Sequence, residues 1–386
     1  MPASVGVAGS FKRVGAYLAV LIVMSCTPAQ SDTKQNADEG AVGTFLPFVD
    51  GPTPRKARMN PPKLHVELGG HRITAVVDTG STGLVVAASA IPDLARLPVL
   101  GPGRLTYSSS GRVMEGHWIQ TSITVAGLGG VHIRTEPMPV LAVTRIACLA
   151  TARNCSPDEH PLRVAMLGIG YAREADYQSQ STPDRNPFLR TEAEASGRSR
   201  RGYILARNGV IVGLSQAPTD RTFTLVRLKR DMRFGDWHAP PACFSINARL
   251  PPDCGTLLVD TGISGSFLTA RDSQLADVVS GTDVKDGTRI EAQIGDGLGP
   301  HLVHSFKVGD PDDLVAPPKV TVARRHGPAF LNTGVRFLKT VLHESAGDRS
   351  SANSLHYYGR WMYSGRPSSS IRFNALTASA ASVARR

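Results

Sequence analysis

The chain has 386 residues, of which 41% are hydrophobic, so it can bury sizeable cores and is not expected to be disordered throughout. Its net charge is +11, but residues 339–386 hold seven basic and two acidic side chains and account for +5 of it (7 − 2). This concentration at one end does not indicate a basic face for nucleic acid, and the 38 Gly and 27 Pro favour a turn-rich, mostly β protein.

Residues 1–25 resemble an export signal. Lys12 and Arg13 precede an apolar run, 16–24, whose length of about nine residues is too short to span a bilayer. The sequence Val-Met-Ser-Cys that ends at Cys26 resembles the lipobox of bacterial lipoproteins, which implies a lipid on Cys26 and a membrane anchor. An ordinary cleaved signal and an uncleaved anchor remain alternatives. We expect a location in the bacterial cell envelope, facing the periplasm or exposed on the outer membrane.

The polar residues 26–60 are typical of a flexible tether. Alternating segments at 63–68 and 72–77 then flank Gly69-Gly70, which predicts a hairpin. A second hairpin is predicted over 203–214, where Asn208-Gly209 can supply the positive φ of a two-residue turn.

Other elements are expected to be short. Strands are predicted at 121–126, 131–134, 138–143, 223–228, 256–259 and 302–307, and a helix at 267–279. The polar residues 191–201 are interpreted as a join between an N-terminal lobe, 61–200, and a C-terminal lobe, 201–338. The basic tail, 339–386, contains ten Ser and little strand patterning, so it is expected to be disordered, a membrane-facing extension, or the product of a frameshift.

The most informative feature is a repeated tripeptide, Asp-Thr-Gly, at residues 78–80 and 260–262. Both copies follow a pair of aliphatic residues and precede a stretch of small residues. The two aspartates are 182 residues apart (260 − 78), and an internal duplication of this size predicts two similar lobes.

Paired aspartates give this repeat a chemical meaning. Two carboxyls held close together cannot both ionise easily, so they share one proton. One can then act as a general base on water and the other as a general acid toward a carbonyl. A neighbouring Thr can hydrogen-bond across the axis between the lobes, and Gly allows the tight turn that exposes the carboxylate.

The repeat resembles the active-site signatures of bilobal, pepsin-like aspartic proteases. The resemblance covers about residues 61–338 and implies two pseudo-symmetric β-barrel-like lobes with a cleft between them. It also implies an aspartic endopeptidase that hydrolyses peptide bonds with water, as a monomer without a cofactor or metal. Asp78 and Asp260 would be catalytic. The supporting residues would be Thr79, Gly80, Ser81, Thr261, Gly262 and Ser264.

Three further segments resemble parts of the same family. Residues 105–111 resemble the start of its flap, where Tyr107 would close over substrate, with Trp118 as an alternative. Residues 164–171 resemble the apolar-Gly strand beside the first aspartate and make Gly168 a candidate substrate-binding residue. Residues 329–334 resemble the second such strand more loosely.

Ile263 departs from the family pattern. Ser81 stands three residues after Asp78 and can donate to its carboxylate, whereas Ile263 stands in the same place after Asp260 and cannot. The sequence therefore predicts that Asp260 lacks a donor, has a raised pKa and carries the shared proton. Ile263 and the atypical tail also leave open a catalytically inactive lipoprotein that binds peptides or cell-envelope partners.

The five cysteines fit an exported protein. Cys26 is assigned to lipidation, and the other four allow three pairings. Short separations and an oxidising location favour Cys148 with Cys155 and Cys243 with Cys254, one disulfide in each lobe. The sequence contains no CxxC or HExxH motif that would indicate a metal site.

Overall fold

The structure is a computed structural model that describes residues 43–50, 60–152, 154–175, 178–214, 223–295, 302–313, 315–323, 327–339, 352–358, 360–364 and 368–374. The export signal and Cys26 lie outside these residues. All of the described residues belong to one compact unit. Among the described helices, none combines the length and the apolar character needed to cross a membrane.

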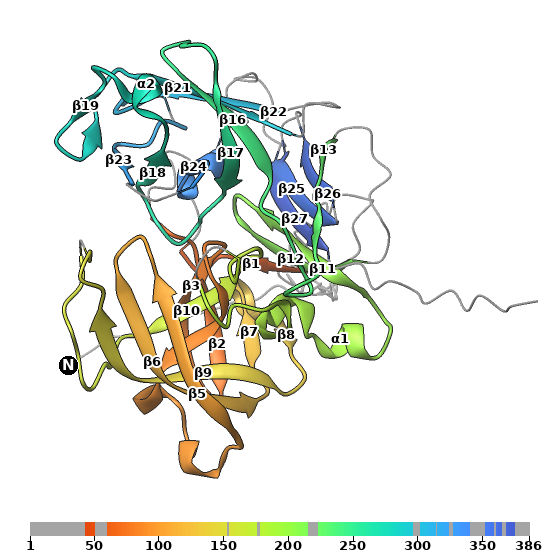
Figure 1. Ribbon diagram of the computed structural model, residues 1–386. Coiled ribbons are helices and arrows are strands. Elements are labelled where there is room, and N and C mark those ends of the chain that lie inside the picture. Colours follow the sequence, from red (N-terminus) through yellow and green to blue (C-terminus); the bar gives the residue numbers. More distant parts are fainter. Residues whose placement is uncertain are drawn as a thin grey trace, which may run out of the picture. The chain divides into compact units, whose positions relative to one another are not determined.

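The protein is mostly β, as predicted, and contains two nine-stranded mixed sheets (Figure 1). The first has the order β5-β6-β9-β4-β10-β3-β2-β7-β8. Its strands are β2 (Lys63–Leu68), β3 (His71–Asp78), β4 (Thr82–Ala87), β5 (Val99–Tyr107), β6 (Arg112–Thr121), β7 (Thr124–Ala126), β8 (His132–Arg134), β9 (Met138–Cys148) and β10 (Ala165–Ile169).

The second nine-stranded sheet has the order β19-β20-β23-β18-β24-β17-β16-β21-β22. Its strands are β16 (Pro241–Ile246), β17 (Asp253–Leu258), β18 (Ser266–Thr269), β19 (Val279–Ser280), β20 (Asp283–Val284), β21 (Arg289–Ile294), β22 (Leu302–Lys307), β23 (Val320–Val322) and β24 (Ala329–Asn332).

The two sheets share a three-strand arrangement. β10 lies between β3 and β4, parallel to the first and antiparallel to the second. β24 lies in the same way between β17 and β18. Each sheet therefore places a central strand beside the strand that leads to one Asp-Thr-Gly segment, which agrees with two similar lobes.

A third sheet has seven strands in the order β1-β12-β11-β27-β25-β26-β13. Its strands are β1 (Thr44–Pro47), β11 (Arg200–Ala206), β12 (Gly209–Leu214), β13 (Phe223–Arg227), β25 (Ala352–Tyr358), β26 (Arg360–Ser364) and β27 (Ser368–Asn374). It brings together three segments that are far apart in the sequence.

This third sheet corrects two predictions. The tether predicted over 26–60 contains strand β1, whose Leu46 is fully buried, as is the adjacent Phe48. The tail, 339–386, contributes three strands, because β27 pairs with β11 and β26 pairs with β13. Neither segment shows clear alternation in its sequence, and the pairing partners supply the hydrogen bonds that hold each strand.

Helices are few and short. They are α1 (Glu192–Ala195), α2 (Asp272–Leu275), and the 3₁₀ turns η1 (Ala88–Ala90), η2 (Leu94–Arg96), η3 (Leu128–Gly130), η4 (Pro183–Arg185), η5 (Pro187–Leu189) and η6 (Val335–Lys339). A small hairpin adds β14 (Arg230–Asp231) and β15 (Asp236–Trp237). The helix predicted over 267–279 was wrong. Its first residues form β18, where Leu268 is fully buried between strands, and only α2 follows.

The first predicted hairpin is confirmed, and the second has a different turn. Gly69 and Gly70 both take positive φ, +52° and +83°, between β2 and β3. In the second hairpin, Gly209 is already the first residue of β12 and has no positive φ, so the loop consists of Arg207 and Asn208.

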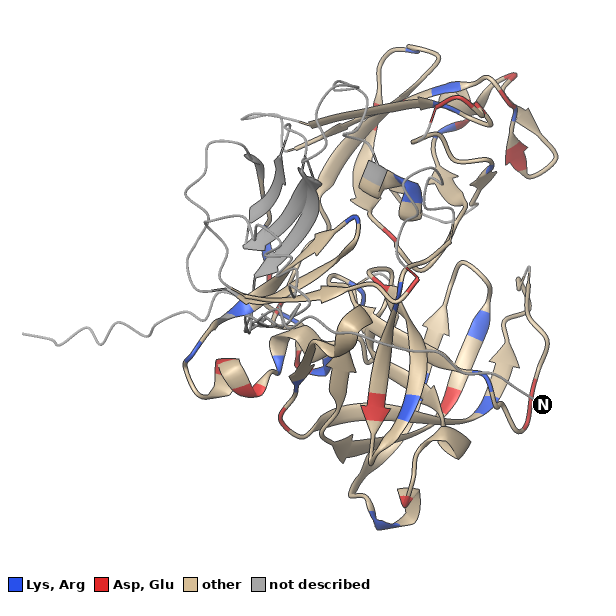
Figure 2. Ribbon diagram, turned by 180° about the vertical axis from the view of Figure 1, so that it is seen from behind, with Lys and Arg blue, Asp and Glu red and all other residues tan. Residues whose placement is uncertain are grey.

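Both predicted disulfides are confirmed. Cys148–Cys155 closes a loop after β9, and Cys243–Cys254 joins directly opposed residues of β16 and β17. Acidic and basic residues are intermixed along the described strands rather than gathered by sign (Figure 2).

Candidate active site

The two Asp-Thr-Gly segments form matching loops at the ends of β3 and β17. In the first, Gly168 of β10 lies opposite Asp78, and a Cβ on Gly168 would meet the Gly83 carbonyl at 2.7 Å. In the second, Gly334 follows β24, and a Cβ there would collide with the carbonyl of Gly265. Glycine is needed at both places because backbone crosses backbone directly behind each aspartate.

Thr79 and Thr261 hydrogen-bond to each other's loops with twofold symmetry. The Thr79 amide donates to the Thr261 hydroxyl at 3.1 Å, and the Thr261 amide donates to the Thr79 hydroxyl at 3.0 Å. Each hydroxyl in turn donates to a carbonyl of the other segment, Thr79 to Val259 and Thr261 to Val77, both at 2.6 Å. These buried bonds fix the two loops against each other.

The glycines of the repeat bring the carboxyls together. Gly80 donates its amide to Asp78 Oδ1 at 2.7 Å, and Gly262 does the same for Asp260 Oδ1 at 2.9 Å. A Cβ on Gly80 would lie 2.5 Å from the Asp260 carboxyl, and one on Gly262 would collide with that of Asp78. A larger residue at either place would therefore displace the opposite aspartate.

A second donor reaches each carboxyl from a different place. Ser81 donates to Asp78 Oδ2 at 2.5 Å, as its position in the sequence predicts. Asp260 Oδ2 accepts from Asn332 Nδ2 at 2.7 Å. The prediction that Asp260 lacks such a donor was therefore wrong, and Ser264 is not among the donors to Asp260. An alignment of Gly334 with Gly168 would have placed Asn332 at the position of Met166, on the strand beside the second aspartate. The position of Asn332 near Asp260 could have been recognised in this way.

Burial raises the pKa of both aspartates, which are 3% and 5% exposed. For Asp78, burial and then the charge of Asp260 raise the pKa to about 8, against hydrogen bonds from Ser81 and Gly80. For Asp260, burial raises the pKa most. The pKa is lowered by hydrogen bonds from Asn332 and Gly262, by the interaction with Asp78 and by the charge of Arg173. These causes favour Asp78 as the protonated member, which is the reverse of the assignment based on Ile263.

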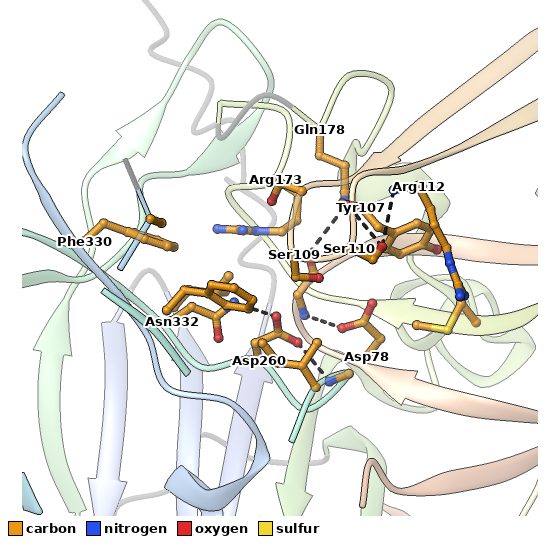
Figure 3. A pocket seen from close by; sticks show the side chains of 18 of the residues that line it. Asp78, Tyr107, Ser109, Ser110, Arg112, Arg173, Gln178, Asp260, Phe330 and Asn332 are labelled. Atoms are coloured by element: carbon orange, nitrogen blue, oxygen red, sulfur yellow. Dashed lines mark hydrogen bonds between the residues drawn. The ribbon is translucent and has the colours of Figure 1, made fainter. Parts of the chain in front are cut away.

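A cavity of about 410 Å³ opens above the two aspartates (Figure 3). Residues 107–110 and Arg112 line it from the hairpin between β5 and β6, in which Tyr107 pairs with Arg112. The second lobe contributes apolar side chains, among them Ile263, Phe267 and Phe330. This β5–β6 hairpin, called the flap below, therefore forms one wall of the cavity.

Tyr107 is half-buried, and its hydroxyl is enclosed near the first aspartate. Burial and then the charge of Asp78 raise its pKa. Its hydroxyl makes no hydrogen bond of good geometry within the described part of the chain, although Ser81 lies close enough to lower the pKa slightly. Trp118 does not line this cavity: its indole donates to Gln180 Oε1 at 2.7 Å, and Arg185 stacks on its ring.

Arg173 and Gln178 also line the cavity, and no sequence motif indicated them. They belong to the segment that follows β10, and both are labelled in Figure 3. Gln178 Nε2 donates to the carbonyls of Gly80 and Thr106, at 3.5 and 3.4 Å, and so links the first loop to the flap strand. Gly168 lies behind the loop of Asp78 and does not line the cavity.

Across the described residues, no group of three or more His, Cys, Asp or Glu side chains is arranged to hold a metal ion. Neither the protein-family models nor the curated proteins that were compared with the chain match it.

Proposed function

We propose that the chain is a bilobal aspartic endopeptidase of the pepsin-like kind, which hydrolyses peptide bonds with a water molecule held between Asp78 and Asp260. The observation that carries this proposal is the reciprocal set of hydrogen bonds between the two Asp-Thr-Gly segments. It holds two buried carboxyls, one from each repeat, on the floor of one cavity. A chain with both repeats does not need a second copy, so the enzyme is proposed to act as a monomer.

The different surroundings of the two aspartates suggest a role for each. Asp260, whose charged form is favoured by Asn332 and Arg173, accepts a proton from water. Asp78, whose pKa is raised to about 8, donates its proton to the oxygen of the scissile carbonyl as the water oxygen bonds to its carbon. The tetrahedral intermediate then releases the amine as a proton returns to its nitrogen. No cofactor takes part.

The proposed substrate is an extended polypeptide under the β5–β6 hairpin. Ser108, Ser109 and Ser110 at the tip of this hairpin line the cavity, as does Tyr107. An extended chain can bind there partly through backbone hydrogen bonds, as in strand addition. The apolar residues of the second lobe would contact its side chains.

The proposed location is the bacterial cell envelope, with a lipid on Cys26 as membrane anchor. The two disulfides support an oxidising compartment, because such bonds persist outside the cytosol. Metabolic labelling with a radioactive fatty acid tests the anchor: wild type should be labelled and Cys26→Ala should not.

Cleavage of a denatured protein by the purified full chain, between pH 3 and 9, tests the activity. Asp78→Asn and Asp260→Asn should each reduce the rate by at least about 1,000-fold while the melting temperature is retained. A statine-type transition-state mimic should inhibit wild type. If wild type cleaves nothing but binds the same polypeptide, the chain is instead a catalytically inactive peptide-binding lipoprotein.

A further inference from the structure

Two glutamine side chains cover the outer edge of β5, one of the two strands of the flap. Among the described strands, β5 is the outermost of the first sheet and has a neighbour on one side only. Gln180 Oε1 accepts the Arg104 amide at 2.9 Å, and its Nε2 donates to the Pro102 carbonyl at 3.5 Å. Gln178 Nε2 donates to the Thr106 carbonyl at 3.4 Å, two residues further along the strand. The two side-chain amides therefore replace part of a strand partner.

Gln178 differs from Gln180 because it also reaches the loop of Asp78. A side-chain amide has two N–H donors, and Gln178 Nε2 donates to the Gly80 carbonyl at 3.5 Å as well. The Gly80 amide in turn donates to Asp78 Oδ1 at 2.7 Å. One side chain at the wall of the cavity thus contacts both the flap and the loop that holds the first aspartate (Figure 3).

The Gln178 side chain is held in place from behind. It is 6% exposed, and its Oε1 accepts the hydroxyl of the fully buried Ser181 at 2.6 Å. The Gln178 amide donates to the Arg173 carbonyl at 3.0 Å, and the Ser181 amide donates to the Glu174 carboxylate at 2.8 Å. Because Oε1 is turned toward Ser181, Nε2 faces the two carbonyls before any substrate binds.

We infer that Gln178 is a positioning residue that sets the distance between the flap and the loop of Asp78. The inference rests on the proposed peptidase function and adds to it a residue that acts through the flap rather than on the reacting atoms. The two bonds from Nε2 are long and therefore weak, so the flap can open for a peptide at small cost and return to the same place. A fixed return position matters because small displacements of reacting groups lower the rate strongly.

Gln178→Met in the full chain tests the inference, because methionine has a similar size but cannot donate. The substrate is a peptide taken from the denatured protein that wild type cleaves. We expect kcat to fall about 10-fold and KM to change at most about two-fold, since the bound peptide is then held less accurately over Asp78. A higher KM with an unchanged kcat would contradict the inference, because Gln178 would then affect binding alone.

Gln180→Met is the matched control. It removes an amide that contacts β5 twice and accepts the Trp118 indole at 2.7 Å, but whose hydrogen bonds within the described residues do not include the loop of Asp78. The melting temperature should fall at least as far as with Gln178→Met, while kcat should stay within about two-fold of wild type. If the two substitutions lower kcat equally, Gln178 contributes only to stability and the inference is wrong.

A double-mutant cycle with Tyr107→Ala shows whether the effect passes through the flap. In this background the flap lacks the side chain nearest to Asp78, so Gln178→Met should lower kcat by less than about two-fold. The same 10-fold loss with and without Tyr107 would show that Gln178 acts independently of the flap, which overturns the inference and leaves the proposed function intact.

Hydrogen exchange in the ligand-free full chain, read by mass spectrometry, tests the contact without catalysis. Gln178→Met should speed exchange several-fold in residues 79–81 and 105–111, whereas Gln180→Met should leave residues 79–81 unchanged. If wild type cleaves no peptide but shows this pattern, the proposed function fails and the positioning of the flap by Gln178 stands. Unchanged exchange in both segments overturns the inference whatever the activity.

Discussion

At the scale of single residues, the two aspartates have different donors. Ser81 reaches Asp78 from within the same loop, whereas Asn332 reaches Asp260 from the strand beside it. The position of Ser81 could be predicted from the repeat, because it lies three residues after the aspartate. Asn332 could not be predicted in this way, because its contact depends on the register of β24 against β17, in which Asn332 lies opposite Leu258.

Substitution of Asn332 should move the acidic limb of the activity profile. Asn332→Ala removes a bond to the charged form of Asp260 and raises the pKa of this carboxyl, so the general base is lost at a higher pH. A hydrogen bond to a charged group contributes roughly 1.5–3 kcal/mol, which corresponds to a shift of about one to two pH units. Profiles of kcat/KM between pH 2 and 7 measure it.

Ile263→Thr is the comparison for Asn332→Ala. Because Asn332 already satisfies Asp260 Oδ2, a new hydroxyl at position 263 should leave the acidic limb within a few tenths of a pH unit. A large shift from Ile263→Thr with none from Asn332→Ala would contradict the assignment of Asn332 as the donor.

Substitution of Ser81 should move the opposite limb. The proposed mechanism requires the proton on Asp78, whose pKa is raised to about 8, so we expect activity to persist at neutral pH and to fall as the pH rises through 8. Ser81→Ala removes a bond that lowers this pKa, so the alkaline limb should move upward while the acidic limb stays in place. A downward shift of the alkaline limb in kcat/KM would count against Asp78 as the acid.

At the scale of elements, the first disulfide supports the tip of the flap. Cys148 and Cys155 close a loop that donates two backbone hydrogen bonds to this tip. The Leu149 amide donates to the Gly111 carbonyl at 2.9 Å, and the Asn154 amide donates to the Ser110 carbonyl at 3.3 Å. It also packs so closely that a Cβ on Gly111 would lie 2.5 Å from Ala152. The flap is therefore held from outside by a covalently closed loop.

Removal of this disulfide should loosen the flap. With both Cys148 and Cys155 replaced by Ser, the amides of Leu149 and Asn154 should exchange faster with solvent, and KM for a peptide should rise several-fold with a smaller change in kcat. The matched control replaces Cys243 and Cys254, which lie across β16 and β17 away from the flap. Equal effects on KM from the two pairs would show that only general stability has changed.

Strands were predictable where the sequence marks both a face and a turn. The segment 63–77 alternates in burial and contains two glycines that take positive φ, so its hairpin followed from local rules. Residues 267–269 begin the segment predicted as a helix, 267–279, but they pair with β23 and β24 and therefore belong to strand β18. Strand β25 pairs with its near neighbours β26 and β27, but the sheet is completed by β11 and β13, which are distant in sequence and could not be predicted as partners.

At the scale of the whole molecule, one buried histidine makes the stability of the folded state depend on pH in the acidic range. His304 is 1% exposed beside the rings of Phe306 and Phe337, and burial lowers its pKa to about 3 from 6.5. The folded state therefore binds fewer protons than the unfolded state between these values. The contribution of neutral His304 to the free energy of unfolding is fully present above pH 6.5 and is lost as the pH falls toward 3.

Substitution of His304 should make the protein relatively more stable in acid. The contribution of Asp78 to stability has the opposite pH dependence and is lost as the pH rises from 3.8 through about 8. The variant must therefore be compared with wild type at each pH, so that the contribution of Asp78 cancels. The free energy of unfolding of His304→Phe minus that of wild type should increase by about 1.4 kcal/mol for each unit below pH 6.5. Urea unfolding at several pH values measures it.

His160→Phe is the control, because it makes the same change of side chain at an exposed position. A difference for His304→Phe that does not change with pH would mean that folding does not lower the pKa of His304.

The seven-stranded sheet has a consequence for the order in which the chain can fold. Strand β11 pairs with β27 in a register that sets Tyr203 opposite Phe373 along the backbone, and 160 residues separate the end of β12 from the end of β27 (374 − 214). At a synthesis rate of about 5–20 residues per second, this separation corresponds to roughly 8–30 s. During that time both Asp-Thr-Gly segments have been made, but β11 still lacks its neighbour and exposes an unpaired strand edge. A ribosome that stops between residues 262 and 352 would thus release a chain with both aspartates and an unpaired strand edge prone to aggregation.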